Sequence, residues 1–484
     1  MAQKGIGNAG EFSLDLVEII AADGATLGIT HNVLELDIYE DIEKPILTGK
    51  IAFNDPVNFM NTLPVVGQEY FKIKVKTPSF EKQEEMIEHL FFAYTISGQE
   101  ELTTTNQVVV MHLISVEGLV NQRKRVDRTL KGTYSDIVST LVRRDLESTK
   151  DIYIEPSSAI KQIIAPDCSP FEVILRAKTQ AISAEFGSPT FFFYETSLGF
   201  HFRSLESMYV QGSSGYYTSQ ALAGSEPRKA GMPNVLSDFQ KIRHWSMGQT
   251  RDSLSFAANG LWASEVIEHD IFNKRYTKST YNYLDAYKDE KHMNDLSDDA
   301  NPSEPLFSSG PVDDNGGRVS DYVKKQYLLP VSLKDAATGT DSHYTNSEGR
   351  YPYQGYNPSK WLSRRTSVEE QLNAGLLVEM QVDGYTALHA GDVVVVELPF
   401  SAYNKSADKE TKDRWIRGSF VIRNLKHTFN IQEMKHTMHL TCFKDSVEKQ
   451  PDGDPLDENP QPKQYGKSNQ ITPKSFVKRE DFYQ

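Results

Sequence analysis

The sequence is poor in cysteine and has no long apolar run. Its two cysteines, Cys168 and Cys442, are too few for a disulfide framework or a cysteine-based zinc site. No run approaches the ~18 apolar residues of a membrane-spanning helix, and the first residues, MAQKGIGNAGEF, lack the apolar segment of a secretory signal. We therefore expect folding in a cytoplasm, no membrane association, and a buried Cys442 on the apolar face of a strand.

Basic residues are outnumbered by acidic ones. The 484 residues include 52 Lys and Arg against 66 Asp and Glu, which gives a net charge of −14. A protein that grips nucleic acid needs cations to neutralise phosphates, so this chain is a poor candidate, although DNA could pass nearby without sticking. With 24% charged and 38% hydrophobic residues, the composition is that of an ordinary globular chain long enough for two to four domains.

Common catalytic motifs are missing. The sequence has no GxSxG, HExxH or GxxxxGK[ST], and no GxGxxG that opens a helix after a strand. Two carboxylates could in principle act as a glycosidase pair. A cluster of acidic residues lies around the first strands, and we interpret it as a solvated acidic face: Glu35, Asp37, Glu40, Asp41 and Glu43.

Three histidines near the C-terminal part of the chain resemble a metal site only in spacing. His436 and His439 form an HxxH pattern, and His427 lies nearby on the partner strand. On a strand, residues three apart point to opposite faces, so His436 and His439 are badly placed to share a metal. We predict no catalytic residues, no cofactor and no metal site.

Two groups of basic residues have a structural interpretation. The run from Arg123 to Arg128 is expected to form salt bridges or part of an interface. Lys72, Lys74 and Lys76 share one face of a strand. They either protect a sheet edge from aggregation or meet an acidic partner subunit.

The sequence contains two similar β-units. The first copy, Gly67 to Val116, is a strand, a charged loop and a hairpin, and the second copy, Gly391 to Phe443, has the same order. Apolar and polar residues alternate in both, as in half-buried strands. The copies are far apart in sequence, which argues against a solenoid and suggests that the two units pair in space.

Between the two copies the pattern changes from strands to mixed structure. Thr133–Arg144 has a helical apolar face, and Ser169 begins a second helix with Pro170 and Glu172 in a capping box. Thr190–Tyr194 and Gly199–Ser204 are predicted to form a hairpin.

Further along, Ser367 is predicted to cap another helix, and Ser320–Leu328 is read as either a strand or a helix. Asn121–Arg128 is expected to be poor in strand, and residues 205–237 and 285–358 are expected to be largely loops. The predicted core residues of the segment 238–282 are Trp245, Phe256, Trp262, Val266 and Ile267.

This order of parts resembles the central baseplate hub protein of contractile-tailed, T-even-like phages, and the related late control protein D and N-terminal region of type VI secretion spike proteins. The segments that carry the resemblance are Val33–Phe59 and Gly67–Val116 for a first tube domain, Gly375–Leu398 and Ser419–Asp445 for a second, and Thr133–Leu146 and Pro166–Ser204 for the insertion between them. The expected fold class is mainly β with an α+β insertion, having two similar β-barrel tube domains separated in sequence.

We expect five ranges along the chain, of which the long loop insertion and the tail have no counterpart in the family. They are a first tube barrel (1–120), an α+β insertion (121–237), a tube-associated β segment with a long loop insertion (238–358), a second tube barrel (359–447) and an extended tail (448–484).

The resemblance also implies a role and partners. The expected role is a non-enzymatic homotrimeric hub in the virion, assembled in the host cytoplasm, whose pseudo-sixfold ring joins the tail tube to a threefold spike. The expected partners are the central spike protein, tail tube or tube-initiator proteins, inner baseplate wedge proteins, the tape measure protein, and genomic DNA that passes through without specific binding. The alternatives are a tail-associated peptidoglycan hydrolase and a receptor-binding tail protein.

Overall fold

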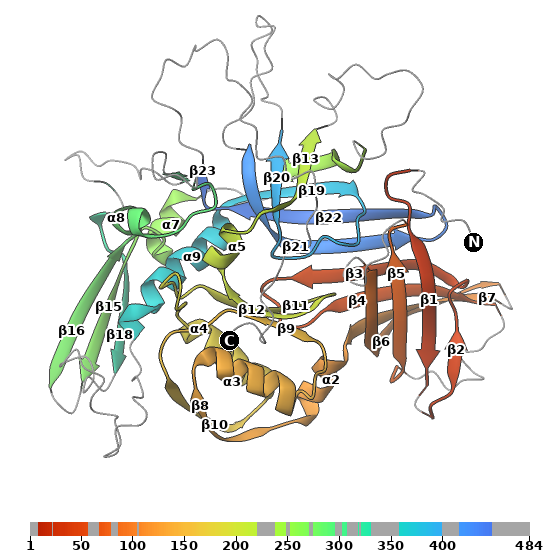
Figure 1. The fold of residues 1–484 in the computed structure, drawn as a ribbon, viewed down its shortest axis with the longest axis horizontal. Helices are drawn as coiled ribbons and strands as arrows, with labels where there is room; N and C mark the ends of the chain where they lie inside the picture. Colours follow the sequence, from red (N-terminus) through yellow and green to blue (C-terminus); the bar gives the residue numbers. More distant parts are fainter. Residues whose placement is uncertain are drawn as a thin grey trace, which may run out of the picture.

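A thirteen-stranded sheet dominates the computed structural model of the chain. The structure describes residues 8–21, 23–56, 67–78, 86–103, 106–219, 238–247, 252–270, 274–295, 303–306, 318, 321–330, 358–398 and 416–447. The protein is mainly β, as predicted, with helices confined to the middle of the chain (Figure 1). No helix in these ranges is long and apolar enough to cross a membrane.

The first β-unit contains the N-terminal strands. They are β1 (Ser13–Ile20), β2 (Thr26–Gly28), β3 (Val33–Asp41), β4 (Thr48–Asp55), β5 (Tyr70–Lys76), β6 (Met86–Thr103) and β7 (Asn106–Ser115). They lie in the order β2-β1-β5-β6-β7-β4-β3. Alternate residues of β4 and β5 are buried, which is the period-two pattern expected of strands with one wet face.

The second β-unit is a closed six-stranded barrel. Its strands are β13 (Ser213–Ser219), β14 (Lys241–Met247), β19 (Leu376–Asp383), β20 (Val393–Glu397), β21 (Gly418–Asn430) and β22 (Lys435–Lys444). The order β21-β20-β13-β14-β19-β22 returns to β21, because β21 also pairs with β22. Cys442 is fully buried in this core, as predicted.

Strand order confirms the internal repeat. The series β1-β5-β6-β7-β4-β3 corresponds position by position to β13-β20-β21-β22-β19-β14. Five of the corresponding strands meet in antiparallel ladders in both units. The exception is β13, which runs parallel to β20, whereas β1 runs antiparallel to β5. The two copies therefore share topology, and not only a hydrophobic pattern.

The α+β insertion packs below the two units (Figure 1). It contains α2 (Val116–Arg123), β8 (Val126–Gly132), α3 (Tyr134–Thr140) with a π-helical turn η2 (Leu141–Asp145), β9 (Asp151–Ile154), β10 (Lys161–Cys168), α4 (Pro170–Gln180), β11 (Phe191–Thr196), β12 (Gly199–Ser204) and α5 (Leu205–Tyr209). The capping box at Ser169 and the β11–β12 hairpin are confirmed.

A smaller sheet with order β16-β15-β18 lies at the far side (Figure 1). The elements of this region are α7 (Ser253–Asn259), β15 (Ala263–Asp270), β16 (Arg275–Asn282), α8 (Tyr283–Ala286), η4 (Tyr287–Asp289), β17 (Glu304–Pro305), β18 (Lys325–Pro330), η7 (Pro358–Lys360) and α9 (Leu362–Ala374), with β23 (Ser446–Val447) paired to β17. The segment Ser320–Leu328 thus contributes to a strand, not a helix.

Asn121–Arg128 is poor in strand, as predicted, since only Val126 to Arg128 belong to β8 and the segment begins with the end of α2. Two local predictions are wrong. Part of 205–237 is ordered as α5 and β13, because the chain must return to the second barrel there. Ser367 lies inside α9, where its hydroxyl donates to the Leu261 carbonyl, 2.6 Å away, instead of capping the helix. Residues 220–237, most of 285–358 and the tail from 448 lie outside the described residues.

One predicted core residue is exposed. Trp262 and Val266 are buried as predicted, but 42% of Trp245 is accessible to solvent. Trp245 lies on β14 beyond Ile242, the last residue of β14 that pairs with β13.

Candidate functional site

The two β-units are joined edge to edge by strands β3 and β21. Glu35 to Asp41 of β3 pair antiparallel with Asn430 to Asn424 of β21, so a single sheet runs from the first unit into the second. On the core side, Phe429 of β21 is fully buried in the hydrophobic cluster of the first unit. Its ring lies 5.3 Å from that of Phe12, edge to face. The second unit therefore completes the core of the first.

Asp37 organises the opposite face of this junction. Only 2% of Asp37 is exposed, and it accepts hydrogen bonds from Thr428 at 2.8 Å and from Tyr39 at 3.1 Å. Lys426 lies 3.0 Å from the same carboxylate and over the Tyr39 ring. Burial and then the neighbouring Asp37 charge raise the pKa of the Tyr39 hydroxyl.

Glu40 joins three segments at the end of the junction. Its carboxylate accepts hydrogen bonds from the backbone N–H of Ser197 at 3.0 Å and of Ala390 at 2.8 Å. Burial would raise the pKa of Glu40, but the charge and hydrogen bond of His389 outweigh it and lower that pKa. The prediction of a solvated acidic face is therefore wrong for Asp37 and Glu40, because partner segments cover both.

Ser197 and Glu40 both contact His389. Ser197 Oγ lies 3.2 Å from His389 Nδ1, and Glu40 Oε1 lies 3.4 Å from the same nitrogen. In a Ser-His-Asp triad the serine and the carboxylate contact different ring nitrogens, so this arrangement differs from that of a triad.

A second buried polar cluster ties the insertion to the first unit. Glu195 of β11 is fully buried and accepts hydrogen bonds from Ser115 at 2.9 Å and from the Leu47 N–H at 3.0 Å. Lys150 Nζ lies 2.6 Å from Glu195 and 2.5 Å from Glu117. Burial acts to raise the pKa of Glu195, yet Lys150 and His89 lower it to about 2. An ionised carboxylate thus holds the two parts together.

The three histidines are divided as the strand geometry predicts. His436 and His427 face each other inside the barrel, with a 3.0 Å contact between ring nitrogens, and burial lowers the pKa of both. His439 lies on the outer face. Within the described ranges, no group of three or more His, Cys, Asp and Glu is arranged to hold a metal ion.

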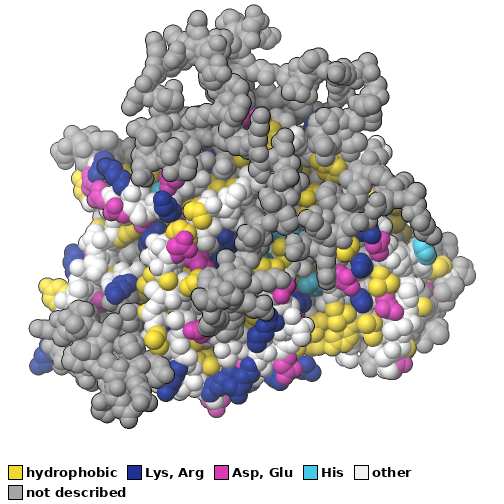
Figure 2. Space-filling view, viewed as in Figure 1, with side chains coloured by type: hydrophobic (Ala, Val, Ile, Leu, Met, Phe, Trp, Pro, Cys, Tyr) yellow, Lys and Arg dark blue, Asp and Glu magenta, His cyan; other side chains and the backbone are white. Residues whose placement is uncertain are grey.

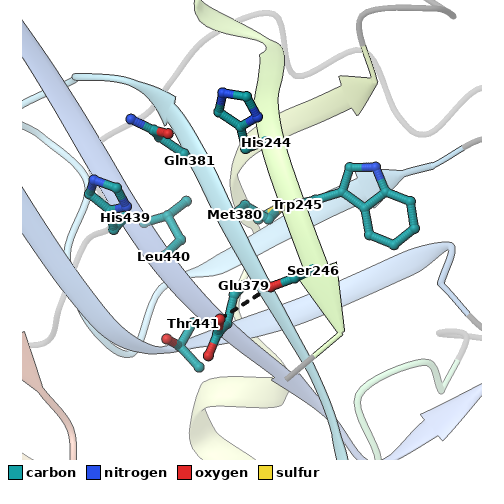
Figure 3. A pocket seen from close by; sticks show the side chains of 9 residues that line it. All are labelled: His244, Trp245, Ser246, Glu379, Met380, Gln381, His439, Leu440 and Thr441. Atoms are coloured by element: carbon teal, nitrogen blue, oxygen red, sulfur yellow. Dashed lines mark hydrogen bonds between the residues drawn. The ribbon is translucent and has the colours of Figure 1, made fainter. Parts of the chain in front are cut away.

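A shallow polar groove follows the outer face of β14, β19 and β22. His244, Gln381 and His439 line one end, and Ser246 donates to Glu379 at 3.2 Å at the other (Figure 3). Trp245 points away from this groove (Figure 3). The Ser246 hydroxyl is thus directed to a carboxylate and not to a histidine.

The basic residues form ion pairs within the chain. Lys74 lies 3.1 Å from Glu88 and Lys76 lies 3.0 Å from Asp15. Strand β5 is flanked by β1 and β6 and is not a sheet edge, so the edge-protection interpretation of these lysines is wrong. In the basic run, Arg128 forms a two-pronged contact with Asp145, which agrees with the predicted salt bridges.

The sequence pointed to the repeated unit but not to the junction. Lys426 and Phe429 lie on β21, whose sequence has only the alternation of an ordinary half-buried strand. No local feature of that sequence shows that β21 pairs with β3. Lys150 and Glu195 are far apart in sequence and belong to no motif.

No protein-family model and no curated protein matches the sequence. Among solved structures, a tail protein from Neisseria meningitidis superposes with a TM-score of 0.47 at 10% identity, over 91% of this chain and 97% of that one. A 43 kDa tail protein of prophage MuSo2 from Shewanella oneidensis gives 0.47 at 8% identity, over 89% and 98%. A type VI secretion component of E. coli gives 0.38 at 10% identity, over 90% and 76%. TM-scores below 0.5 at such identities carry no argument about the function of this chain.

Proposed function

We propose that this chain is the structural hub subunit of a contractile phage tail baseplate. Three copies form a pseudo-sixfold ring that joins the sixfold tail tube to the threefold central spike and lets DNA pass. The observation that carries the proposal is the duplicated β-unit, joined edge to edge through β3 and β21. Three chains supply six similar units only if each chain carries the unit twice.

The ring requires contacts that repeat from unit to unit. A junction between two different edges is heterologous, and repeating such a contact produces either a closed ring or an open filament. The β3–β21 junction has this form. Strand β3 of the first unit corresponds to β14 of the second unit and not to β21, so the junction joins two different edges. The chain therefore contains one complete example of the proposed ring contact.

The proposed partners follow from this position in the tail. They are the central spike protein, tail tube or tube-initiator proteins, inner baseplate wedge proteins and the tape measure protein, in a virion assembled in the host cytoplasm. A net charge of −14 suits DNA that slides through without specific binding. The ranges 1–120, 121–237, 238–358, 359–447 and 448–484 stay predictions for the domain boundaries.

A non-enzymatic role is part of the proposal. The buried carboxylates Asp37, Glu40 and Glu195 are committed to internal partners, which leaves them unable to serve as a hydrolase acid–base pair. If the chain were a peptidoglycan hydrolase, the purified protein would clear a cell-wall suspension. If it were a receptor-binding protein, it would bind host cells in isolation.

Light scattering across a concentration range tests the proposal. The chain mass is 54.7 kDa, and the proposal predicts a particle of three times this mass, alone or after co-expression with a spike protein. A monomer under both conditions, or a stable particle of two or four chains, would contradict it.

A further inference from the structure

Two strand edges have no partner among the described residues. Strand β19 pairs with β14 as far as Met247, but β13 reaches only Lys241 and Ile242 on the other edge of β14. Strand β7 pairs with β6 as far as Thr103, but the β5 ladder on the other edge of β6 stops at Phe92. Unpaired N–H and C=O groups make such edges natural sites for strand addition.

The repeat relates β14 to β3. The register of β3 on β4 shifts between Val33 and Glu35, at the second residue of β3, and that of β14 on β19 shifts between Ile242 and His244, at the third residue of β14. With these irregularities matched, Trp245 corresponds to Leu36.

The same comparison relates β6 to β21. The first register shift of β6 against β7, at Tyr94, matches the shift of β21 against β22 at Arg423. Strand β6 has two further shifts that β21 lacks, between Ile96 and Gly98 and between Glu101 and Thr103, so we count the correspondence through the hairpin partners β7 and β22. Beyond the bulge, the edge of β21 that faces away from β22 is the edge that receives β3. The open second half of β6 is therefore the counterpart of an edge that is paired inside the chain, and the open edge of β14 is the counterpart of β3.

Burial differs between the corresponding residues. Leu36 is fully buried at the β3–β21 junction, as is Ile38, the counterpart of Met247. In contrast, 42% of Trp245 and 48% of Met247 are exposed. Figure 2 shows apolar side chains gathered on the surface over β6. Tyr94, at the start of the open half of β6, is 50% exposed, whereas Leu90, which is 39% exposed, lies where β5 pairs with β6. Exposed apolar side chains thus lie along the open edge of β14 and at the start of the open half of β6.

We propose that the open edge of β14 in one chain pairs antiparallel with the second half of β6 in a second copy of this chain, in the register of β3 on β21. This pairing rests on the proposed function, and it would form the contact between neighbouring chains in the proposed ring. The Asp37–Thr428 pair corresponds to Ser246 of one chain opposite Glu100 of the next. The occupant is a second copy because each open edge is the counterpart of one of the two strands already paired in the internal junction.

Engineered cysteines test this register. In a Cys168→Ser background, which leaves only the buried Cys442, chains with Ser246→Cys are mixed with chains carrying Glu100→Cys and oxidised mildly. Thr428 and Asp37 touch at 2.8 Å across the internal junction, so the corresponding cysteines are close enough for a disulfide. The matched control is Glu88→Cys, on the part of β6 that β5 already covers. A disulfide-linked pair is expected with Glu100→Cys and not with Glu88→Cys.

The double variant, with Ser246→Cys and Glu100→Cys in one chain, tests whether the ring closes at three chains. The proposal predicts a covalent ladder that ends at three chains. A second test uses Trp245→Lys, which places a charge on an exposed position and should shift the mass in solution towards the monomer. Leu328→Lys is its control, since 70% of Leu328 is exposed on the separate small sheet.

The outcomes separate this inference from the proposed function. A three-chain particle without the 246–100 disulfide, or one that Trp245→Lys leaves intact, would contradict the proposed pairing of β14 with β6. It would leave the hub proposal standing. A chain that stays monomeric both alone and after co-expression with a spike protein would overturn both. A ladder that continues beyond three chains would show the predicted pairing in an open filament, and the closed-ring form of the proposal would be wrong.

Discussion

At the scale of single residues, buried ionised groups connect parts of the chain that are distant in sequence. Glu195 and Lys150 join the insertion to the first β-unit, and Glu40 joins β3 to the segments around Ser197 and Ala390. The number of acidic residues in the sequence favoured a solvated surface for such carboxylates. Covering strands from elsewhere in the chain give Glu40 and Glu195 their partners instead, and no local pattern signals that.

Removing the cation of the Glu195 cluster is predicted to be strongly destabilising. Lys150→Met leaves Glu195 and Glu117 buried without their counter-charge, and breaking a buried pair in this way costs about 3–5 kcal/mol. Urea unfolding followed by circular dichroism measures the loss. The control is Lys124→Met, which removes the exposed ion pair with Glu147 and should leave the unfolding midpoint unchanged. Equal effects of the two variants would show that the cluster has no special role.

Acidification is predicted to destabilise the barrel through its histidine pair. Burial lowers the pKa of His427 to about 4, so its ring stays neutral in the fold while it is protonated in the unfolded chain below ~6.5. The stabilisation is complete above pH ~6.5 and is lost as the pH falls towards 4, by roughly 1.4 kcal/mol per pH unit for each such histidine.

Unfolding free energy measured from pH 7 to pH 5 checks this slope. The variant His427→Gln should flatten it, whereas replacing the exposed His31 by Gln should not. A slope that is the same in all three proteins would contradict the assignment to the buried pair.

At the scale of elements, the sequence pattern was most informative where local signals are strong. The capping box at Ser169 and the alternation in β5 and β22 depend on neighbouring residues alone, and both predictions are confirmed. The predicted cap at Ser367 is wrong because α9 begins at Leu362, several residues before the position that the capping signal suggested. The prediction that Trp245 is a core residue is wrong because β14 continues beyond the residues that pair with β13.

Strand β21 is predicted to matter to both units. Phe429→Ala removes a ring that fills the core of the first unit from a strand of the second, and such a truncation costs about 3–5 kcal/mol. Hydrogen exchange should show weakened protection in β1 and β3 as well as in β21. Met434→Ala, in the exposed turn after β21, is the control and should change neither. Loss of protection confined to the second unit would mean that β21 does not complete the first core.

At the scale of the whole molecule, the repeat could be predicted from the sequence, but the way in which the two β-units join could not. Two similar β-units predicted pairing in space, and the strand orders confirm that they are copies. The sequence could not show that β3 and β21 provide the junction, because pairing between distant strands depends on the closure of the barrels. For the same reason, only the structure reveals that β6 and β14 each have an edge without a strand partner among the described residues.

The account depends most directly on the architecture of the assembled particle. Electron microscopy of the purified chain, alone or bound to its spike, should show a ring with threefold symmetry, a central hole and six similar β-units. Within that ring, every second contact between barrels would be the internal β3–β21 junction. A ring of only three barrels, or a particle in which the two β-units of each chain lie at different radii, would contradict the central claim.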